Sequence, residues 1–535
     1  MAPADLGIAW RFSSQLPAFL RRRVDAHAAA EVLRQRLANR ADDFLRMLRD
    51  DIYADPDSPY VGLLRHAGCE YGDVEQLVRR DGVEGTLQAL YRNGVYLTGN
   101  ELKGRQPARR GSATLAIDPE RLRNRRSAFH VPVRSGASRG PGLPILVDFA
   151  ALEELAVNFH LALVARGGTD WVKSVWAAPG GSVVSSSLLM AISFGVPPDR
   201  CFLYVDPRAP GLHPRYRWSL RLMRWTGWLA GMRFRRPLLV PVHAAMPVAR
   251  WMADVIRSGR TPYLAAHPSA AARVCEIAEE NGLDLRGARF SLRGEPITSG
   301  RLAGVRRAGA EAIPLYGTIE CGTIGNGCAT PQAADEVHLL DDLHAVIQCD
   351  SAAATDLPPG ALLITSLRPT ARLTLLNVST GDVAAMDRRA CGCPLERLGW
   401  KTHVHAIRSF EKLTAGGMTF LGTNVVRVLE EVLPARFGGS ALDYQLIEEE
   451  GANGRPRLRL VVGSRIGPID GRAVADVFLG AIGSGSGVEH VMELVWRDAG
   501  FLQVERGALQ TTAAGKVLHL HSNRSAAEPA DQQPE

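Results

Sequence analysis

The segment Leu315-Tyr316-Gly317-Thr318-Ile319-Glu320 begins about twenty residues after the segment Ser291-Leu292-Arg293-Gly294-Glu295-Pro296. The ring of Tyr316 is suited to stacking on a purine, and the carboxylate of Glu320 is suited to holding Mg²⁺ through water. By itself the later segment fits a buried tyrosine and a solvated glutamate equally well. Two such segments at this spacing are much rarer by chance, so together they predict a nucleotide site.

A glycine-rich stretch lies well before this pair. Residues 133–142 read Val133-Arg134-Ser135-Gly136-Ala137-Ser138-Arg139-Gly140-Pro141-Gly142 and follow an expected strand. Their glycines let backbone amides come close to phosphate oxygens, and two serine hydroxyls stand among them. The stretch therefore predicts a phosphate loop, with an ordinary surface turn as the alternative.

Two charged positions follow in order toward the C-terminus. The turn Ser379-Thr380-Gly381-Asp382 ends an apolar run, and its acceptor-only carboxylate either binds both hydroxyls of a ribose or belongs to an ordinary turn. Arg408 comes 26 residues later, where the sequence changes character. It fits either a hinge contact with the nucleotide or an interdomain salt bridge.

The fifth segment is Thr511-Thr512-Ala513-Ala514-Gly515-Lys516. Lysine is scarce in this arginine-rich chain, where the only others are Lys103, Lys173, Lys401 and Lys412. A compact ammonium suits a crowded oxyanion better than a wide, planar guanidinium does. Lys516 is therefore a candidate catalytic residue, and the alternative is a solvated lysine near a disordered terminus.

Composition limits the class of protein. A chain of 535 residues exceeds one ordinary core, and 46% hydrophobic with 22% charged residues indicates a folded protein of two or more domains. No uncharged apolar stretch of about 18 residues occurs, so no membrane insertion is expected. The N-terminus shows no secretory signal, which favours the cytoplasm. The net charge of +7 lacks the basic and aromatic repeats of nucleic-acid binders, so we expect no nucleic-acid partner and an attraction for anionic substrates.

The pattern of apolar residues predicts an α/β protein. Helical spacing in residues 26–49 and 60–91 predicts a helical N-terminal layer over 1–105. Short apolar runs at 238–242, 361–366 and 373–378 alternate with helical stretches such as 269–281, which predicts layered α/β subdomains over 106–407. Beyond them, helices at 425–433 and 471–481 with strands at 458–462 and 492–496 predict a small, mobile α+β domain after a hinge, over 408–521. A disordered tail is expected over 522–535.

The ordered set of segments resembles the adenylate-forming superfamily of acyl-CoA synthetases, and most closely its phenylacetate coenzyme A ligase branch, over about residues 59–524. The resemblance implies ATP and Mg²⁺ as cofactors. It assigns Arg408 as the arginine before the hinge and Lys516 as the catalytic lysine. It also implies that the nucleotide and its Mg²⁺ are bound by Ser135, Gly136, Ser138, Gly140, Gly294, Glu295, Pro296, Tyr316, Gly317, Thr318, Glu320 (the Mg²⁺ ligand) and Asp382 (the ribose ligand).

The chain also departs from the family pattern. The usual S-G-T-T-G-x-P loop here has one hydroxyl fewer and an inserted Arg139. The usual Y-G-x-T-E has Ile319 where a threonine normally helps to hold phosphate, so slower adenylation or a hydroxyl supplied by Thr318 is expected. The hinge position, normally acidic, aligns with Phe410 or Glu411.

The resemblance implies a two-step reaction. A carboxylate attacks the α-phosphate of Mg·ATP to give an acyl-adenylate, and a nucleophile then displaces AMP. Coenzyme A is the first choice of acceptor, with a carrier-protein thiol or an amine as alternatives. The acid is aromatic or aliphatic, in a pocket drawn from residues 176–194 and 242–251, and the enzyme is a monomer or a homodimer. A degenerate, non-catalytic nucleotide-binding member is the rival hypothesis.

The cysteine pattern adds a possible metal site. Eight cysteines in a chain expected to be cytosolic fit thiols or metal ligands better than disulfides. Cys328, His338, Cys391 and Cys393 supply the three thiolates and one imidazole that satisfy tetrahedral Zn²⁺, with Cys321 as a spare ligand. Buried thiols and a surface histidine are the alternative, and the resemblance to phenylacetate-ligase-like proteins favours zinc. Its role would be structural.

Overall fold

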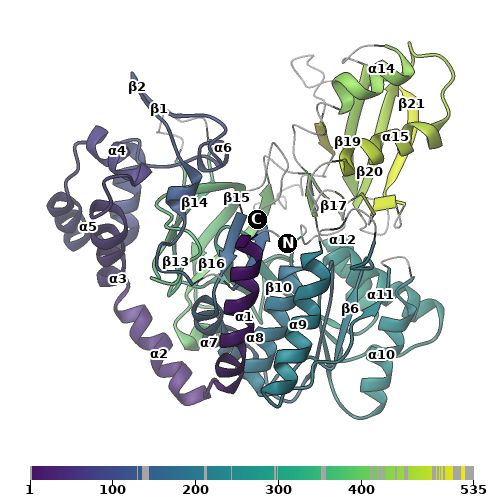
Figure 1. Ribbon diagram of the computed structural model, residues 1–535, viewed down its shortest axis with the longest axis horizontal. Coiled ribbons are helices and arrows are strands. Elements are labelled where there is room, and N and C mark those ends of the chain that lie inside the picture. Colours follow the sequence, from purple (N-terminus) through teal and green to yellow (C-terminus); the bar gives the residue numbers. More distant parts are fainter. Residues whose placement is uncertain are drawn as a thin grey trace, which may run out of the picture.

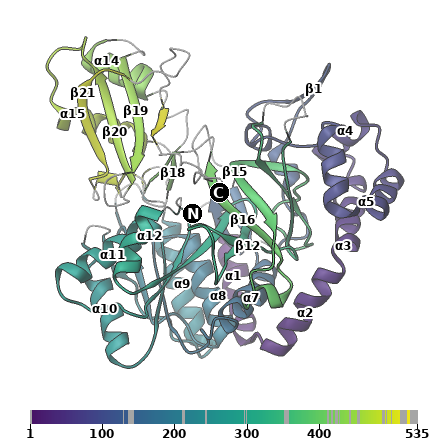
Figure 2. The same cartoon turned by 180° about the vertical axis from the view of Figure 1, so that it is seen from behind.

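The computed structural model describes residues 3–128, 130–134, 144–209, 212, 214–241, 244–294, 297, 299–350, 357–409, 413–415, 418–420, 425, 428–439, 443–450, 456–484, 490, 493–494, 496–497, 500–509 and 520–523. Figures 1 and 2 show a large body of helices around a long sheet, with a smaller unit at one corner. Among the described helices none has the length and apolar character needed to cross a bilayer.

The N-terminal part is helical, as predicted. Asp25 caps the second helix by accepting a hydrogen bond from Ala28, and Thr98 and Glu101 form a capping box at the last helix. Apolar side chains of this layer pack against one end of the long sheet. The elements are α1 (Pro3–Arg21), α2 (Ala26–Ala38), α3 (Arg40–Met47), η1 (Leu48–Tyr53), α4 (Pro59–His66), α5 (Tyr71–Arg92) and α6 (Gly99–Leu102).

The central sheet has a parallel half and an antiparallel half, in the order β13-β14-β15-β16-β12-β11-β10-β9-β8-β5-β6-β7. Among the described residues the parallel half has six strands, of which the inner β5 and β8 are almost entirely buried, as expected of strands covered on both faces, whereas the edge strand β7 is exposed. These six strands are β5 (Val172–Ala177), β6 (Arg200–Leu203), β7 (Leu238–Leu239), β8 (Pro262–Ala266), β9 (Arg289–Leu292) and β10 (Glu311–Thr318).

The remaining strands of this sheet pair antiparallel. They are β11 (Gly322–Gly327), β12 (Val337–Leu339), β13 (His344–Gln348), β14 (Ala361–Ser366), β15 (Val378–Arg388) and β16 (Thr402–Ser409), with the short helix η4 (Glu396–Leu398) before the last. The run at 373–378 is not a strand before Val378. Buried Asn377 has a φ of 49° and donates to Leu87 O and Val95 O, which turns the backbone out of the extended conformation.

Helices cover both faces of the parallel half. Side chains alternate across β5, so Trp176 packs toward α10 and α11 while Val175 packs toward α7, α8 and α1. The helices are α7 (Phe149–Val164), α8 (Gly181–Phe194), α9 (Arg215–Leu229), α10 (Met246–Arg257), α11 (Pro268–Glu280) and α12 (Ser299–Arg307). Small accessory elements are β1 (Ala108–Arg110), β2 (Ala113–Leu115), η2 (Pro119–Leu122), β3 (Val131–Arg134), β4 (Pro144–Val147), β17 (Leu413–Ala415) and β18 (Met418–Phe420).

The C-terminal unit is a separate four-stranded sheet in the order β21-β20-β19-β22. Its elements are η5 (Val428–Val432), α14 (Leu433–Phe437), β19 (Tyr444–Glu450), β20 (Pro456–Gly463), α15 (Gly471–Gly483), β21 (Leu502–Gly507) and β22 (Leu520–Asn523). The predicted strand at 458–462 and helix at 471–481 are confirmed.

The expected helix at 425–433 is helical at its described residues, where the π-helix η5 leads into α14. Two details of this unit differ from the sequence-based prediction. The expected strand at 492–496 is helical at Glu493, Leu494 and Trp496, where Glu493 pairs with His490 and Arg497 at helical spacing. The expected tail begins too early, because Ser522 and Asn523 pair with β19.

Candidate active site

A cavity of about 350 Å³ opens at the carboxyl ends of the parallel strands. The chain runs from β5 to β6 and β7 on one side and then returns to β8, β9 and β10 on the other, so the strand order reverses beside β5. Ligands of open α/β sheets bind at such a reversal. The cavity is lined there by residues 175–179, 265–267, 293–294 and 315–319, together with the first turns of α8 and α9.

Four of the predicted nucleotide ligands lie on this cavity, namely Gly294, Tyr316, Gly317 and Thr318. A side chain at position 317 is excluded, because a Cβ atom there would lie 2.3 Å from Gly322 O across the turn between β10 and β11. The glycine therefore allows the backbone at the end of β10 to pack closely against the start of β11. Ile319 also lines the cavity, where the family pattern has a threonine.

Tyr316 brings the predicted adenine and ribose positions together. Its hydroxyl donates a hydrogen bond of 3.1 Å to Asp382 Oδ2 on β15, and both side chains are buried. Burial raises the pKa of Tyr316 well above its ordinary value, so the hydroxyl keeps its proton and acts as the donor. Asp382 is not among the described residues that line the cavity.

Glu320, the predicted Mg²⁺ ligand, is buried directly after β10. Its Oε1 lies 3.9 Å from Nζ of Lys103, which comes from the end of α6 in the helical layer. Thr318 sits close by and accepts a hydrogen bond from Cys321 N. In this conformation an ammonium group thus takes the place near Glu320 where a cation is expected.

Arg408 lies away from the cavity, at the end of β16. Its Nη1 donates to Asp335 Oδ2 at 3.0 Å, and Asp335 also accepts hydrogen bonds from Ala406 N and Ile407 N. Ala406 has a φ of 52°, which marks a backbone irregularity just before Arg408. Arg408 is therefore held by a carboxylate on the loop between β11 and β12.

A second group of predicted residues meets beside β11 and β12, the strands where the antiparallel half adjoins the parallel half. The ligand atoms of Cys328, His338, Cys391 and Cys393 all lie within 4.8 Å of one another. His338 Nε2 is 3.2 Å from Cys393 Sγ and 3.6 Å from Cys391 Sγ. Its Nδ1 faces Trp400 O at 2.8 Å, so Nδ1 carries the proton and the lone pair of Nε2 points at the sulfur atoms.

This arrangement fits a tetrahedral metal site. Zinc bonds of about 2.3 Å to sulfur and about 2.0 Å to nitrogen place neighbouring ligand atoms roughly 3.5–3.8 Å apart, close to the separations seen here. The spare ligand Cys321 is not part of the group and instead lines a small cavity beside Arg372. None of the eight cysteines, all of them among the described residues, forms a disulfide.

No known protein-family model matches the chain, and no curated protein matches its sequence. Solved structures do match by fold. The 2-hydroxyisobutyryl-CoA ligase in complex with 2-HIB-AMP and CoA superposes with a TM-score of 0.53 at 15% identity, over 94% of this chain and 92% of the ligase. This chain therefore has the fold of that ligase.

Two further matches are more distant. An o-succinylbenzoate CoA synthetase from Bacillus subtilis has a TM-score of 0.42 at 13% identity, over 74% of this chain and 69% of that one. An amide bond synthetase from Marinactinospora thermotolerans has a TM-score of 0.40 at 14% identity, over 90% and 92%. The fold is therefore assigned from the likeness to the 2-hydroxyisobutyryl-CoA ligase.

Several predicted site residues lie outside the part of the chain that the structure describes. They are Ser135, Gly136, Ser138 and Gly140 of the phosphate loop, Glu295 and Pro296 beside Gly294, and Lys516. The strands on both sides of the phosphate loop, β3 and β4, are described, and Pro132 of β3 lines the cavity.

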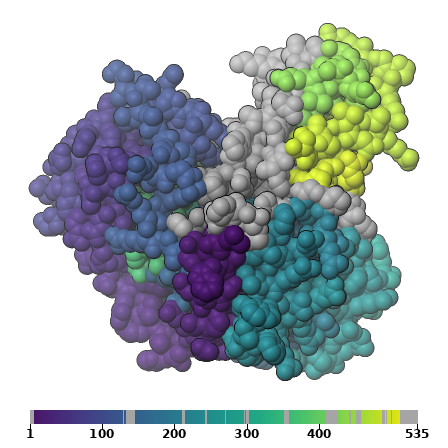
Figure 3. All heavy atoms as spheres, viewed as in Figure 1, coloured from purple at the N-terminus to yellow at the C-terminus, as the bar shows by residue number. Residues whose placement is uncertain are grey.

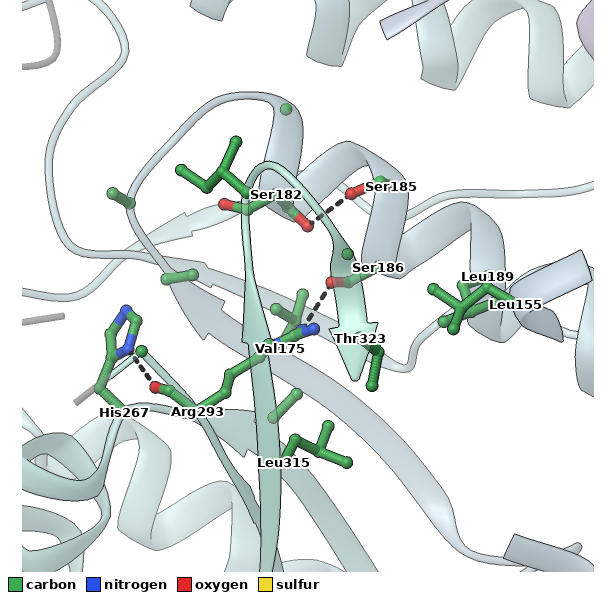
Figure 4. A pocket seen from close by; sticks show the side chains of 18 of the residues that line it. Leu155, Val175, Ser182, Ser185, Ser186, Leu189, His267, Arg293, Leu315 and Thr323 are labelled. Atoms are coloured by element: carbon green, nitrogen blue, oxygen red, sulfur yellow. Dashed lines mark hydrogen bonds between the residues drawn. The ribbon is translucent and has the colours of Figure 1, made fainter. Parts of the chain in front are cut away.

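Sequence reasoning missed three arginines on the cavity wall, Arg215 of α9, Arg293 and Arg372. Arg293 extends from the end of β9, and its Nη2 donates to Ser186 Oγ of α8 at 2.7 Å (Figure 4). Arg372 comes from the connection between β14 and β15 and donates to Ile319 O at 2.8 Å. Arg293 was detectable, because a charged residue directly after a buried strand lies at the edge where ligands bind. Arg372 follows no such strand and carried no signal.

Proposed function

We propose that the protein activates a carboxylic acid with ATP through an acyl-adenylate and transfers the acyl group to a thiol, that of coenzyme A. One observation carries the proposal. In an adenylate-forming fold, Gly294, Tyr316, Gly317 and Thr318 line one cavity at the strand-order reversal, and Tyr316 is hydrogen-bonded to Asp382. These are the positions that the phenylacetate-ligase resemblance assigns to the nucleotide.

In the proposed reaction a carboxylate oxygen attacks the α-phosphorus of ATP and pyrophosphate leaves. The thiol then attacks the acyl carbon, and AMP leaves with the electron pair of the acyl–oxygen bond. Asp382 binds the ribose hydroxyls, and the cavity wall at 316–318 faces the base. Lys516 neutralises charge between the carboxylate and the α-phosphate. Mg²⁺ held through Glu320 neutralises phosphate charge when it is bound.

Two ion pairs support a second candidate, a non-catalytic nucleotide-binding protein. Glu320 is paired with Lys103, and Arg408 is paired with Asp335, so both predicted functional groups already have protein partners. Catalysis requires Lys103 to yield its position to Mg²⁺. Arg408 would have to leave Asp335 if it contacts the nucleotide. A protein that only binds nucleotides requires neither change.

A pyrophosphate–ATP exchange assay with a panel of carboxylic acids separates the two candidates. We expect acid-dependent exchange in the native protein and a loss of at least about 100-fold in Lys516→Ala, with ATP affinity nearly unchanged. Lys401→Ala is the matched control, because Lys401 is exposed and does not line the cavity. Acid-independent ATP binding without exchange would favour the non-catalytic candidate, and native exchange in Lys516→Ala would refute the role of that lysine.

We also propose that Cys328, His338, Cys391 and Cys393 hold one structural Zn²⁺. Three thiolates and one imidazole leave no open coordination position, so the ion would not take part in the reaction. It would join the loop after β11 to the segment between β15 and η4. The supporting observations are the mutual distances of the four ligand atoms and the hydrogen bond that orients His338.

A further inference from the structure

Two of the arginines on the cavity wall donate hydrogen bonds to neutral oxygens. Among the described residues, neither Arg293 nor Arg372 forms an ion pair with a carboxylate; they donate to oxygens of Ser186 and Ile319, and the nearby Glu320 carboxylate does not bond to Arg372. Burial lowers the pKa of Arg372 to about 10, against the opposing effect of the Glu320 charge, and lowers that of Arg293 as well, yet both stay protonated near neutral pH. Both arginines are half-buried, so an anion that enters the site would compensate charges that are only partly screened by solvent.

The two arginines approach the same end of the cavity. Arg293 also lines a small cavity beneath it, and Arg372 lines another beside it. Leu155 and Thr323 line all three, so this is one continuous region. Figure 4 shows Arg293 reaching toward α8, with Leu155 and Leu189 near Ser186. The apolar wall suits a carbon chain, and the guanidinium groups suit a carboxylate by planar hydrogen bonding.

We propose that the acid activated here carries a second carboxylate, bound by Arg293 and Arg372, so that the substrate is a dicarboxylic acid. The inference rests on the proposed adenylation. One carboxylate is presented to the α-phosphate while the other is held at the arginine end. A monoacid of the same length leaves both guanidinium groups uncompensated, and a site built around polar partners discriminates strongly against such an analogue.

The test compares α,ω-dicarboxylic acids of increasing chain length with their monomethyl esters, which keep the shape and remove one charge. In pyrophosphate exchange we expect at least a tenfold higher kcat/KM for the best diacid. Arg293→Met and Arg372→Met should each raise KM for the diacid at least tenfold and leave the ester within about threefold. Arg286→Met, a change at an exposed arginine paired with Asp284, is the control.

The outcomes are separable. An ester used as well as its diacid, or variants that weaken both equally, would overturn the dicarboxylate inference while leaving adenylation intact. Variants that lose ATP affinity instead would assign the arginines to the nucleotide and also overturn it. If no acid supports exchange, the proposed function fails. In that case calorimetric titration with the diacid and with the ester, in the absence of ATP, tests the dicarboxylate inference. The inference stands only if the native protein binds the diacid selectively and both the Arg293→Met and Arg372→Met variants lose that binding.

A second observation concerns the surface. Between Asp206 and Asp254 the chain has nine arginines and no acidic residue, although its whole net charge is only +7. The positive charge is thus concentrated in this part of the chain. Arg217, Arg221, Trp225 and Trp228 follow each other on one exposed face of α9 at helical spacing. Both tryptophans are 60% exposed.

Helix α1 extends this face. It packs beside α9, as Figures 1 and 3 show, and exposes Leu6 and Trp10, the latter at 74%. Among the described residues Arg217 and Arg221 form no ion pair. We name the exposed side chains of Leu6, Trp10, Arg217, Arg221, Trp225 and Trp228 the tryptophan–arginine face. Exposed indoles next to unpaired arginines are the composition of helices that lie in the interface of an anionic bilayer.

We infer that the tryptophan–arginine face docks on an anionic lipid surface, without insertion of a spanning helix. The arginines complement the charge of anionic headgroups, and the indole rings prefer the headgroup region. An acidic protein would match the arginines but offers no general reason for three exposed tryptophans.

Vesicle co-sedimentation tests this inference. We expect binding to vesicles with about 30% phosphatidylglycerol that is at least tenfold stronger than to pure phosphatidylcholine and that weakens with salt. A Trp225→Ser, Trp228→Ser double variant and an Arg217→Gln, Arg221→Gln double variant should each lose most of it, whereas Arg286→Gln should not. Equal binding to neutral vesicles, no binding, or a native dimer that the tryptophan variant makes monomeric would overturn the inference.

Discussion

Removing the Asp382 carboxylate should abolish the ability of the protein to recognise ribose. Asp382 is only 8% exposed, and the Tyr316 hydroxyl holds it at 3.1 Å, so the carboxylate is both poorly screened and fixed in place. Hydrogen bonds to a buried charge contribute about 1.5–3 kcal/mol each. With two ribose hydroxyls and some loss to desolvation, we expect a net contribution of about 2–4 kcal/mol, which corresponds to roughly 30- to 900-fold in Kd.

The assay is calorimetric titration with ATP and with 2′,3′-dideoxy-ATP, in the absence of any acid. The native protein should bind ATP more tightly by that factor, and Asp382→Ala should bind the two nucleotides within about threefold of each other. Tyr316→Phe is the matched control, because it removes the hydrogen bond to Asp382 but keeps the ring and the carboxylate, so it should retain the preference for ATP. A native protein that binds both nucleotides equally, or a preference that survives in Asp382→Ala, would refute the assignment.

Three further predictions concern the metal, pH and the Lys103 pair. The purified protein should contain about one zinc per chain by mass spectrometry, and Cys393→Ser should lose the metal and at least about 5 °C in Tm, whereas Cys321→Ser should lose neither. Burial lowers the pKa of His130 to about 4, and its Nδ1 accepts a hydrogen bond from Phe149 N. The unfolded chain therefore binds more protons below pH 6.5, and the free energy of unfolding should fall by up to about 1.4 kcal/mol per pH unit between pH 6.5 and 4. Urea titrations of His130→Gln should show a smaller slope with pH. An unchanged slope would contradict the role of His130. Without Mg²⁺, Lys103→Met should lower the free energy of unfolding by about 2 kcal/mol. In thermal unfolding, added Mg²⁺ should stabilise this variant more than it stabilises the native protein. An equal response of the native protein and the variant to Mg²⁺ would show that Glu320 does not bind Mg²⁺.

The sequence was informative wherever local pattern and final environment agree. Buried apolar runs such as 361–366 became strands, and the spacing in 26–49 and 60–91 became helices, because burial on one or both faces dictates those patterns. The apolar pattern gave the wrong secondary structure where the interactions of a single side chain set the local backbone conformation. Asn377 interrupts an apolar run by bonding two backbone oxygens from the helical layer, and ion pairs of Glu493 make a helix from a segment with strand-like composition.

The candidate site was predictable only in part for a related reason. Gly294, Tyr316, Gly317 and Thr318 sit at the ends of neighbouring strands, so their meeting follows from strand order. Lys103 meets Glu320 only because the helical layer folds over the sheet, and no spacing in the sequence links them. The pairing of Arg408 with Asp335 likewise depends on how two loops of the antiparallel half approach each other.

The position of β22 has a practical consequence for anyone preparing shortened proteins. Lys516 belongs to a connection whose two ends, β21 and β22, are both strands of one sheet, with β22 bound alongside β19. A chain that stops before Leu520 would keep the lysine but release one of its two attachments. Such a truncation should therefore behave like a loss of the lysine itself, and affinity tags are better placed after residue 535.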